Sequence, residues 1–146
     1  MDYSASFQIS ATGMAVEKLR LDVTAANLAN MHSTASSADR LYRPLRVISQ
    51  ERPFAQQFDG LYGVVPTTIN GGVQVMGIEQ LAVAPRSVYE PGHPHADAKG
   101  FVAYPGINHN AEMINMMSAL RAYEANVVAM NAAKTMAART LDIGGQ

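Results

Sequence analysis

The chain contains no cysteine and no tryptophan among its 146 residues. The lack of cysteine excludes disulfide bonds, thiolate zinc sites and cysteine nucleophiles. A net charge of −1 gives no electrostatic reason for binding to nucleic acid or to an anionic membrane surface. The sequence also lacks a basic start followed by an apolar run, so we predict no cleaved signal peptide. If the protein is exported, we expect it to use another route.

Proline and glycine are scarce at both ends of the chain. All seven prolines lie between Pro44 and Pro105, and eight of the eleven glycines lie between Gly60 and Gly106. Because both residue types interrupt helices, this distribution predicts two helical ends around a turn-rich centre. The common phosphate-binding, dinucleotide-binding and serine-hydrolase motifs are all missing, so nothing here indicates those enzyme classes.

The C-terminal stretch is predicted to form one long helix. Neither proline nor glycine occurs between Asn108 and Ile143, and apolar residues recur in alternating steps of three and four, which is heptad spacing. The positions are Met113, Met116, Leu120, Tyr123, Val127, Met130, Lys134, Ala137 and Leu141, and only Lys134 breaks the apolar series. Such a helix would be roughly 50 Å long. The spacing therefore predicts pairing with another long helix.

The N-terminal stretch, from about Tyr3 to Met31, is the predicted partner helix. Apolar residues repeat in this stretch every seven positions, at Phe7, Met14, Leu21 and Leu28. Both helices carry a second apolar row, made of Ile9, Val16 and Val23 in one and Ile114, Met117, Val128 and Ala132 in the other. A helix with two apolar sides is buried on more than one side, and charges interrupt these rows too often for a membrane span. The rows favour neighbouring subunits over an ordinary core helix of a bundle.

The centre of the chain reads as short strands. We expect strands at Tyr42–Ile48, Val73–Val83, Arg86–Tyr89 and Phe101–Tyr104, with a bulge or bend at Gly77. Residues 53–70 are expected to form a loop or excursion. The predicted fold class is α+β, with the terminal helices paired as a coiled coil around a small β-rich centre. The predicted domains are one discontinuous helical domain, residues 1–36 with 108–146, and a central β-rich domain, residues 37–107.

One segment resembles a metal site. His93-Pro94-His95-Ala96-Asp97 has the HxHxD ligand spacing of metallo-β-lactamase-like hydrolases, and His109 could add an imidazole. A catalytic metal needs about three protein ligands and an open position. That fold needs a longer chain and further ligands, so we favour a rigid turn at 91–94 with Asp97 capping the next turn. We therefore expect no catalytic residue, no metal and no cofactor.

Single charged residues elsewhere indicate no chemistry. Glu112 and Glu124 are expected to be solvated or ion-paired carboxylates on a helix surface. Asp39, Arg40 and Arg43 are expected to lie in a polar loop that leads into an edge strand.

Three stretches resemble one family. Ala26-Asn27-Leu28-Ala29-Asn30 is similar to a signature of bacterial flagellar rod, hook and hook-associated proteins, whose asparagines would satisfy backbone groups where the helix ends. The segment 89–102 and the segment from Glu112 to Val127 resemble that family's central and C-terminal patterns. The short length and the central segment are most similar to a proximal rod subunit. His95 stands where the family usually has leucine, Phe101 where it has tyrosine, and Met31-His32 where it has an Ala-Asp-type pair.

The resemblance implies a structural subunit of the proximal rod of the flagellar basal body, which assembles through its terminal helices into the axial drive shaft. It implies unfolded export through the flagellar type III gate to the periplasm. The implied partners are other rod proteins and further copies, with the membrane ring complex and export apparatus nearby. Another axial rod or hook protein is the alternative, followed by the metal-dependent hydrolase.

The predicted assembly interface combines the heptad rows with the signature. Its residues are Phe7, Met14, Leu21, Asn27, Leu28, Asn30, Met113, Met116, Leu120, Tyr123, Val127 and Met130. Since one pairing covers only one side of each helix, we expect the ends of a free subunit, to about Ser36 and from about Asn108, to be disordered or transiently helical. The centre, from about Arg40 to Ile107, should fold alone.

Overall fold

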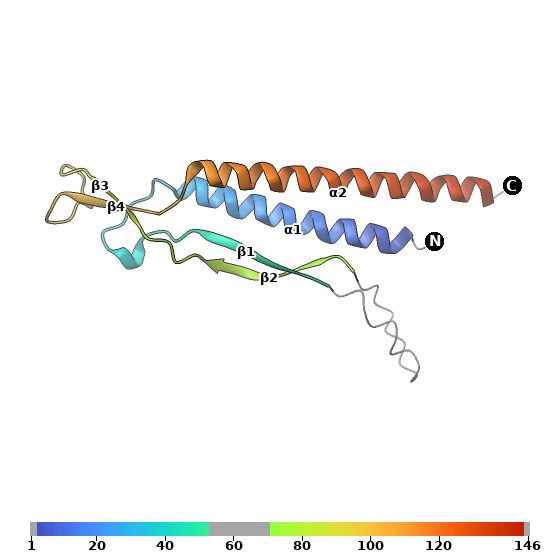
Figure 1. Ribbon diagram of the computed structural model, residues 1–146, viewed down its shortest axis with the longest axis horizontal. Helices are drawn as coiled ribbons and strands as arrows, with labels where there is room; N and C mark the ends of the chain where they lie inside the picture. The colour runs from blue at the N-terminus through green and yellow to red at the C-terminus, as the bar shows by residue number, and fades with distance from the viewer. Residues whose placement is uncertain (1–2, 53–70, 145–146) are drawn as a thin grey trace, which may run out of the picture. The chain divides into compact units, whose positions relative to one another are not determined.

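The computed structural model describes residues 3–52 and 71–144 (Figure 1). The elements follow in the order α1 (Tyr3–Asn30), η1 (Ala38–Arg40), β1 (Leu45–Glu51), β2 (Val73–Gln80), β3 (Arg86–Tyr89), β4 (Phe101–Tyr104) and α2 (His109–Gly144). The predicted mixed α+β class is confirmed. The excursion predicted for residues 53–70 lies outside the described residues.

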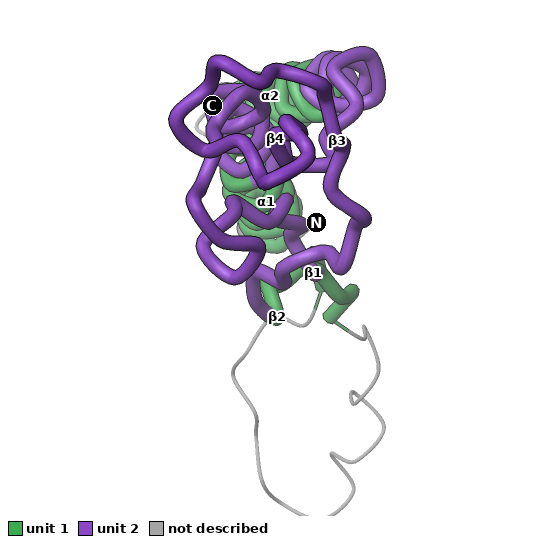
Figure 2. The backbone as a smooth tube through the Cα atoms, turned by 90° about the vertical axis from the view of Figure 1, so that its left-hand side faces the viewer, with its two compact units in different colours: residues 1–19, 49–76, 119–146 green, residues 20–48, 77–118 purple. Residues whose placement is uncertain are grey.

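The chain divides into two compact units (Figure 2). The described part of unit 1 comprises residues 3–19, 49–52, 71–76 and 119–144, and unit 2 comprises residues 20–48 and 77–118. Each unit therefore contains a part of α1, a part of α2 and a part of the centre. The division into a helical and a β-rich domain stays a prediction.

Side chains at the helix ends explain where the two helices stop and start. At the end of α1, the Asn30 amide donates to the Ala26 carbonyl over 2.8 Å, and the Ser33 hydroxyl donates to the Asn30 carbonyl over 2.8 Å. At the start of α2, Asn108 Oδ1 accepts from the backbone N–H groups of Asn110 and Ala111, as an N-cap does. Within the described residues, neither helix has a stretch apolar enough for its length to cross a membrane.

The strands form two separate two-stranded sheets, β1 with β2 and β3 with β4. β3 and β4 occupy their predicted ranges and pair antiparallel, with Arg86 opposite Tyr104 and Tyr89 opposite Phe101. β1 begins three residues later than predicted and β2 ends three residues earlier. Pro44 directly precedes β1 and limits its start.

The β1–β2 pair contains one extra residue in its second strand. The Arg52 N–H donates to the Gly72 carbonyl over 2.9 Å, and the Leu81 N–H donates to the Pro44 carbonyl over 2.7 Å. Between these two bonds the first strand advances by eight residues, from Pro44 to Arg52, and the second advances by nine, from Gly72 to Leu81. A regular antiparallel ladder keeps one register, so the extra residue forms a bulge. The bulge predicted at Gly77 falls within this stretch.

The row of covered side chains on α2 differs from the predicted heptad row. The covered side chains include Glu112, Met116, Ala119, Tyr123, Asn126, Met130, Ala133 and Ala137. The two rows agree at every second position and are one residue apart between them. Ala119 is fully buried whereas Leu120 is 46% exposed, so the predicted phase is wrong there, and Met113 is also exposed. Ala133 is buried in place of Lys134, which explains the charge that seemed to interrupt the row.

Gly13 allows the two helices to approach each other closely in unit 1. In unit 1, a Cβ added to Gly13 of α1 would lie 2.9 Å from the side-chain amide of Asn126 on α2. Glycine and alanine let two backbones approach more closely than leucine would allow. On α1 the buried apolar side chains are Val16 and Val23, whereas Met14 and Leu21 of the predicted row are only partly covered.

Candidate assembly site

Among the residues that the structure describes, Asn27, in the second half of α1, has the most hydrogen-bonded buried side chain. It is 2% exposed, and its amide has four hydrogen bonds. Its Nδ2 donates to the Leu45 carbonyl over 2.9 Å and to a Glu112 carboxylate oxygen over 3.2 Å. Its Oδ1 accepts from the Tyr42 hydroxyl over 2.9 Å and from the Leu45 N–H over 2.8 Å. We call Asn27, Tyr42, Leu45 and Glu112 the Asn27 cluster.

The Asn27 cluster joins α1, the start of β1 and the first turn of α2 within unit 2. The sequence predicted that Asn27 satisfies backbone groups at the end of its own helix. That prediction is wrong for Asn27, which satisfies the backbone of Leu45, and it is right for Asn30. The reason is position, because Asn27 points from the buried side of α1 while Asn30 lies in its last turn.

Tyr42 and Glu112 are functional candidates that sequence reasoning missed. Burial raises the pKa of the Tyr42 hydroxyl, and the nearby Glu112 carboxylate raises that pKa further. The hydroxyl therefore stays protonated and remains a donor to Asn27. Glu112 was expected to be solvated or ion-paired, but it accepts a hydrogen bond from an amide 85 residues earlier in the chain. The only signal in the sequence was the presence of Asn27 and Glu112 in two separate family patterns.

In unit 1, a second polar contact ties α1 to β2. The Thr12 hydroxyl donates to the Ile9 carbonyl over 2.8 Å and accepts from the Val73 N–H over 3.2 Å. Gly72, the residue before this strand, has φ of +90°, and a Cβ there would collide with the Thr12 hydroxyl oxygen. Glycine is therefore required at this position for both conformation and space.

The segment between β3 and β4 is a tight, hydrogen-bonded loop, as predicted. The His93 N–H donates to the Glu90 carbonyl over 3.1 Å, which closes the first turn. Asp97 Oδ1 accepts from the N–H groups of Lys99 and Phe101 over 2.8 and 2.9 Å, which closes the second. These bonds, that from Phe101 foremost, hold the pKa of the Asp97 carboxyl below its ordinary value. The predicted capping role of Asp97 is confirmed.

The two histidines of this loop make contacts of their own. His93 Nδ1 lies 3.0 Å from the His95 N–H, and His95 Nδ1 lies 3.0 Å from the Thr34 hydroxyl. Their rings meet edge to face, with centroids 5.5 Å apart. In the part of the chain that the structure describes, no three histidine, aspartate or glutamate side chains are grouped so that they could hold a metal ion.

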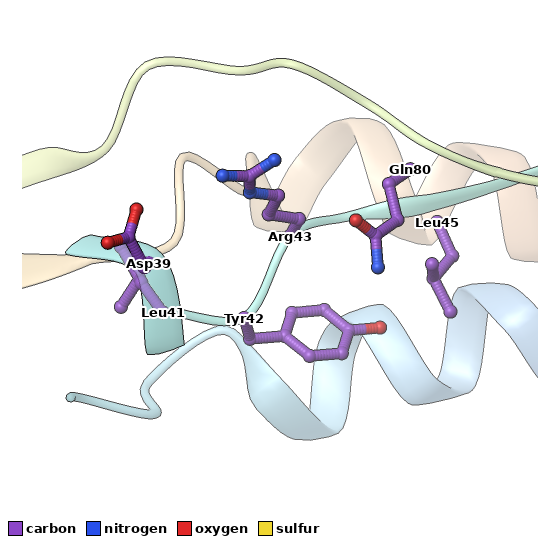
Figure 3. Close-up of a pocket in the computed structure, with 6 residues that line it drawn as sticks. All are labelled: Asp39, Leu41, Tyr42, Arg43, Leu45 and Gln80. Atoms are coloured by element: carbon purple, nitrogen blue, oxygen red, sulfur yellow. The ribbon is translucent and has the colours of Figure 1, made fainter. Parts of the chain in front are cut away.

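An open hollow of about 420 Å³ lies beside the Asn27 cluster (Figure 3). Its lining comes from η1, from the segment that leads into β1, and from both strands, as Asp39, Leu41, Tyr42, Arg43, Leu45 and Gln80. The charged loop predicted around Tyr42 is therefore one wall of this hollow. No nucleophile paired with a base lines it, and its chemistry is that of a protein surface.

The side of α2 opposite its covered row is exposed and carries both apolar and charged residues. We call Ile114, Met117, Arg121, Glu124, Val128 and Ala132 the outer row of α2; all six are exposed. Ile114 and Val128 are each 67% exposed and Met117 is 51% exposed. This agrees with the second apolar row expected from the sequence. Two charged residues, Arg121 and Glu124, separate Ile114 and Met117 from Val128 in this row.

The twelve predicted interface residues differ in how far the fold covers them. Only Asn27 is buried, and it contacts Glu112 and not the heptad row. Met116, Tyr123 and Met130 lie in the covered row of α2, whereas Met113 and Leu120 lie beside it and are exposed. The remaining six are partly covered. Whether any of them meets another subunit stays a prediction.

The chain is similar over nearly its whole length to known proteins. A family model described as the flagellar basal body rod FlgEFG protein C-terminal matches residues 98–143. This range includes the residues that follow Asp97 in its loop, all of β4 and most of α2. The flagellar basal-body rod protein FlgC of Escherichia coli O6:H1 (strain CFT073) is 36% identical over 138 residues, covering 94% of this chain and 95% of its own.

More distant bacteria have relatives of the same kind. FlgC of Borreliella burgdorferi is 33% identical over 142 residues, covering 93% of each chain. FlgC of Bacillus subtilis (strain 168) is 32% identical over 148 residues, covering 95% of this chain and 96% of its own. The chain therefore belongs to the FlgC family of flagellar basal-body rod proteins.

Proposed function

We propose that this rod subunit contributes to the basal body through paired terminal helices, and that neighbouring subunits cover the outer row of α2. The single observation that carries the proposal is the exposure of Ile114, Met117 and Val128 on one side of a 36-residue helix. Burying a side chain of this size contributes about 1.5–3 kcal/mol relative to leaving it in water. An isolated monomer leaves these side chains in water, whereas an assembly that covers them gains this free energy of burial.

The proposed pairing of the two helices is an antiparallel coiled coil. Gly13 lies against Asn126 in unit 1, and Asn27 bonds to Glu112 in unit 2. Later residues of α1 thus meet earlier residues of α2. The covered row of α2 advances by alternating steps of four and three, which is the spacing that such pairing needs.

The remaining details follow from family membership. We infer export through the flagellar type III route without a cleaved signal, and assembly in the periplasm with other rod proteins and further copies of this chain. The membrane ring complex and the export apparatus would lie nearby. The role needs neither catalysis nor a cofactor. Metal analysis of the purified protein tests the alternative of an enzyme, for which stoichiometric zinc would be required.

The experiment that tests the assembly role compares two neighbouring exposed residues of α2. Val128→Asp places a carboxylate in the outer row, where burial by a neighbour would leave it without a partner. Ala129→Asp places the same group outside the row and serves as the matched control. In cells that lack the native gene, we expect the Val128→Asp chain to be made but absent from isolated basal bodies, with loss of swimming. Normal swimming with Val128→Asp would contradict the proposal.

A further inference from the structure

The exposed side of α1 carries a row that matches the outer row of α2. We call Ala11, Ala15, Lys18, Asp22, Ala25 and Ala29 the outer row of α1; all six are exposed. They follow one another in steps of four and three along a single continuous helix, so their side chains share one face. Four of the six are alanines, and the two charged residues stand in the middle.

The two rows differ in size in a complementary way. At its ends the outer row of α2 presents Ile114, Met117 and Val128, which project from the helix. The outer row of α1 presents only methyl groups at its ends. Large side chains pack closely against a helix face whose own side chains are small, because the backbones can then approach each other. The middle of each row is charged, with Arg121 and Glu124 on α2.

The charges select one direction. In a parallel arrangement of the two rows, Lys18 would meet Arg121 and Asp22 would meet Glu124, so that both pairs would repel. In the antiparallel arrangement Lys18 meets Glu124 and Asp22 meets Arg121, so that both pairs attract. Within the described residues none of these four side chains takes part in an ion pair or a side-chain hydrogen bond. All four are therefore available to a partner.

The same arrangement brings every large side chain of one row opposite an alanine of the other. The facing pairs are Ile114 with Ala29, Met117 with Ala25, Arg121 with Asp22, Glu124 with Lys18, Val128 with Ala15 and Ala132 with Ala11. The parallel arrangement would also place these large side chains opposite alanines, so size permits both directions and the charges alone select the antiparallel one.

We propose that, in the assembled rod, the outer row of α2 in one copy of the chain docks antiparallel on the outer row of α1 in a second copy. This inference rests on the proposed function and names the partner of the outer row. The two rows are different surfaces, so the contact is heterologous and repeats from copy to copy. Exposed ion pairs contribute little free energy, so the charges fix direction and register while the apolar ends supply affinity.

The lack of native cysteine permits a direct test by crosslinking. Two versions of the chain, one with Ala15→Cys and one with Val128→Cys, are expressed together in cells that lack the native gene, and isolated basal bodies are oxidised. We expect a disulfide-linked dimer that contains one chain of each version. A disulfide requires Cα atoms within roughly 7 Å. Ala15→Cys with Met117→Cys is the control, because Met117 lies eleven residues from Val128, roughly 16 Å along the helix.

Charge reversal supplies the second arm of the test. Asp22→Arg alone and Arg121→Asp alone should each weaken the Ala15–Val128 crosslink, and the two changes together should restore it. Crosslinking through Ala15→Cys and Met117→Cys, or to a different rod protein, would overturn the proposal. Incorporation of both chains without a crosslink would overturn it as well, and would leave the assembly role intact. If the chains that carry only the cysteine substitutions were absent from basal bodies, the assembly role itself would be overturned.

Discussion

At the scale of single residues, Asn27 has a role that no other side chain can fill. The Asn27 cluster requires a short side chain with two donors on one atom and an acceptor on another. Aspartate has the shape but no donors, and glutamine has the donors but one more methylene group. The amide is buried, so each lost bond leaves a polar group without water.

We therefore predict that Asn27→Ala lowers the free energy of unfolding substantially. Each buried polar group left without a partner costs about 1–3 kcal/mol, and the change removes the partners of both backbone groups of Leu45. Asn30→Ala is the matched control, since Asn30 donates only to a carbonyl of its own helix. Urea denaturation followed by circular dichroism measures both. Equal losses for the two variants would show that the cluster adds nothing beyond helix termination.

A second residue-scale prediction concerns pH and the Asp97-capped loop. The folded pKa of Asp97 lies below its ordinary value of 3.8, so the carboxylate stabilises the loop above that value. This contribution is lost as pH falls through the lower folded pKa. Titration of the amide proton shifts of Lys99 and Phe101 by nuclear magnetic resonance should show a step below pH 3.8. Asp97→Asn keeps an acceptor oxygen and should show no step. A step that survives in Asp97→Asn would assign it to another group.

The sequence could identify these residues but not all of their partners. Asp97 contacts groups two and four residues away, so turn chemistry was sufficient to predict its role. Asn27 contacts groups 15, 18 and 85 residues away. Such contacts depend on how the chain folds back, which no local pattern contains.

At the scale of elements, the close approach of α1 and α2 in unit 1 depends on Gly13. Glycine within a helix costs about 1 kcal/mol relative to alanine. Here glycine leaves room for Asn126, whose side-chain amide lies where a Cβ would otherwise be. The Asn126 amide donates to the Ala122 carbonyl over 2.9 Å.

This predicts a non-additive pair of substitutions. Gly13→Ala alone should destabilise the chain or leave it unchanged, since the gain in helix propensity is lost to the collision with Asn126. In the background of Asn126→Ala, the same change should stabilise the chain by about 1 kcal/mol. A double-mutant cycle of urea denaturation measures the difference. A gain from Gly13→Ala that is equal in both backgrounds would show that the helices do not approach each other there.

The positions of the helices and strands along the sequence were largely predictable. The rotation of α2 about its own axis, which decides its covered side, was not. β3 and β4 occupy their predicted ranges, and the helix bounds differ from prediction by one residue. The phase of α2 was missed because the helix is apolar on two sides, so hydrophobic spacing alone fits more than one row. Leu120 is the more hydrophobic choice, but the small Ala119 permits the closer approach and is buried. Gly13 leaves room for the side-chain amide of Asn126, and that pairing is invisible before folding.

At the scale of the whole molecule, the expectation of disordered ends in a free subunit stays a prediction, which the two compact units make more specific. Unit 2 contains the Asn27 cluster and the fully buried Val102, so it has internal reasons to stay ordered. Unit 1 contains residues 119–144 of α2, where most side chains are exposed. Few buried contacts mean low local stability.

We therefore predict graded amide exchange in the dilute monomer. Residues 3–19 and 119–144 should exchange fast, and residues 20–30 and 101–118 should exchange more slowly. In isolated basal bodies all four segments should be protected, because ordering is coupled to assembly. Hydrogen exchange with mass spectrometry measures both states. Slow exchange throughout residues 119–144 in a proven monomer would show that the two helices satisfy each other within one chain.

The Asn27 cluster has a mechanical consequence. A heptad row offers an equivalent position every seven residues, roughly 10 Å along a helix, so two helices held only by apolar rows can slip by one repeat under load. The cluster has no copy one repeat away, because residues 20 and 34 are arginine and threonine. Its four bonds are directional and fail on a small rotation or shift. Asn27 would then act as a stop against slippage of α1 along its neighbours in the fold when the rod is loaded.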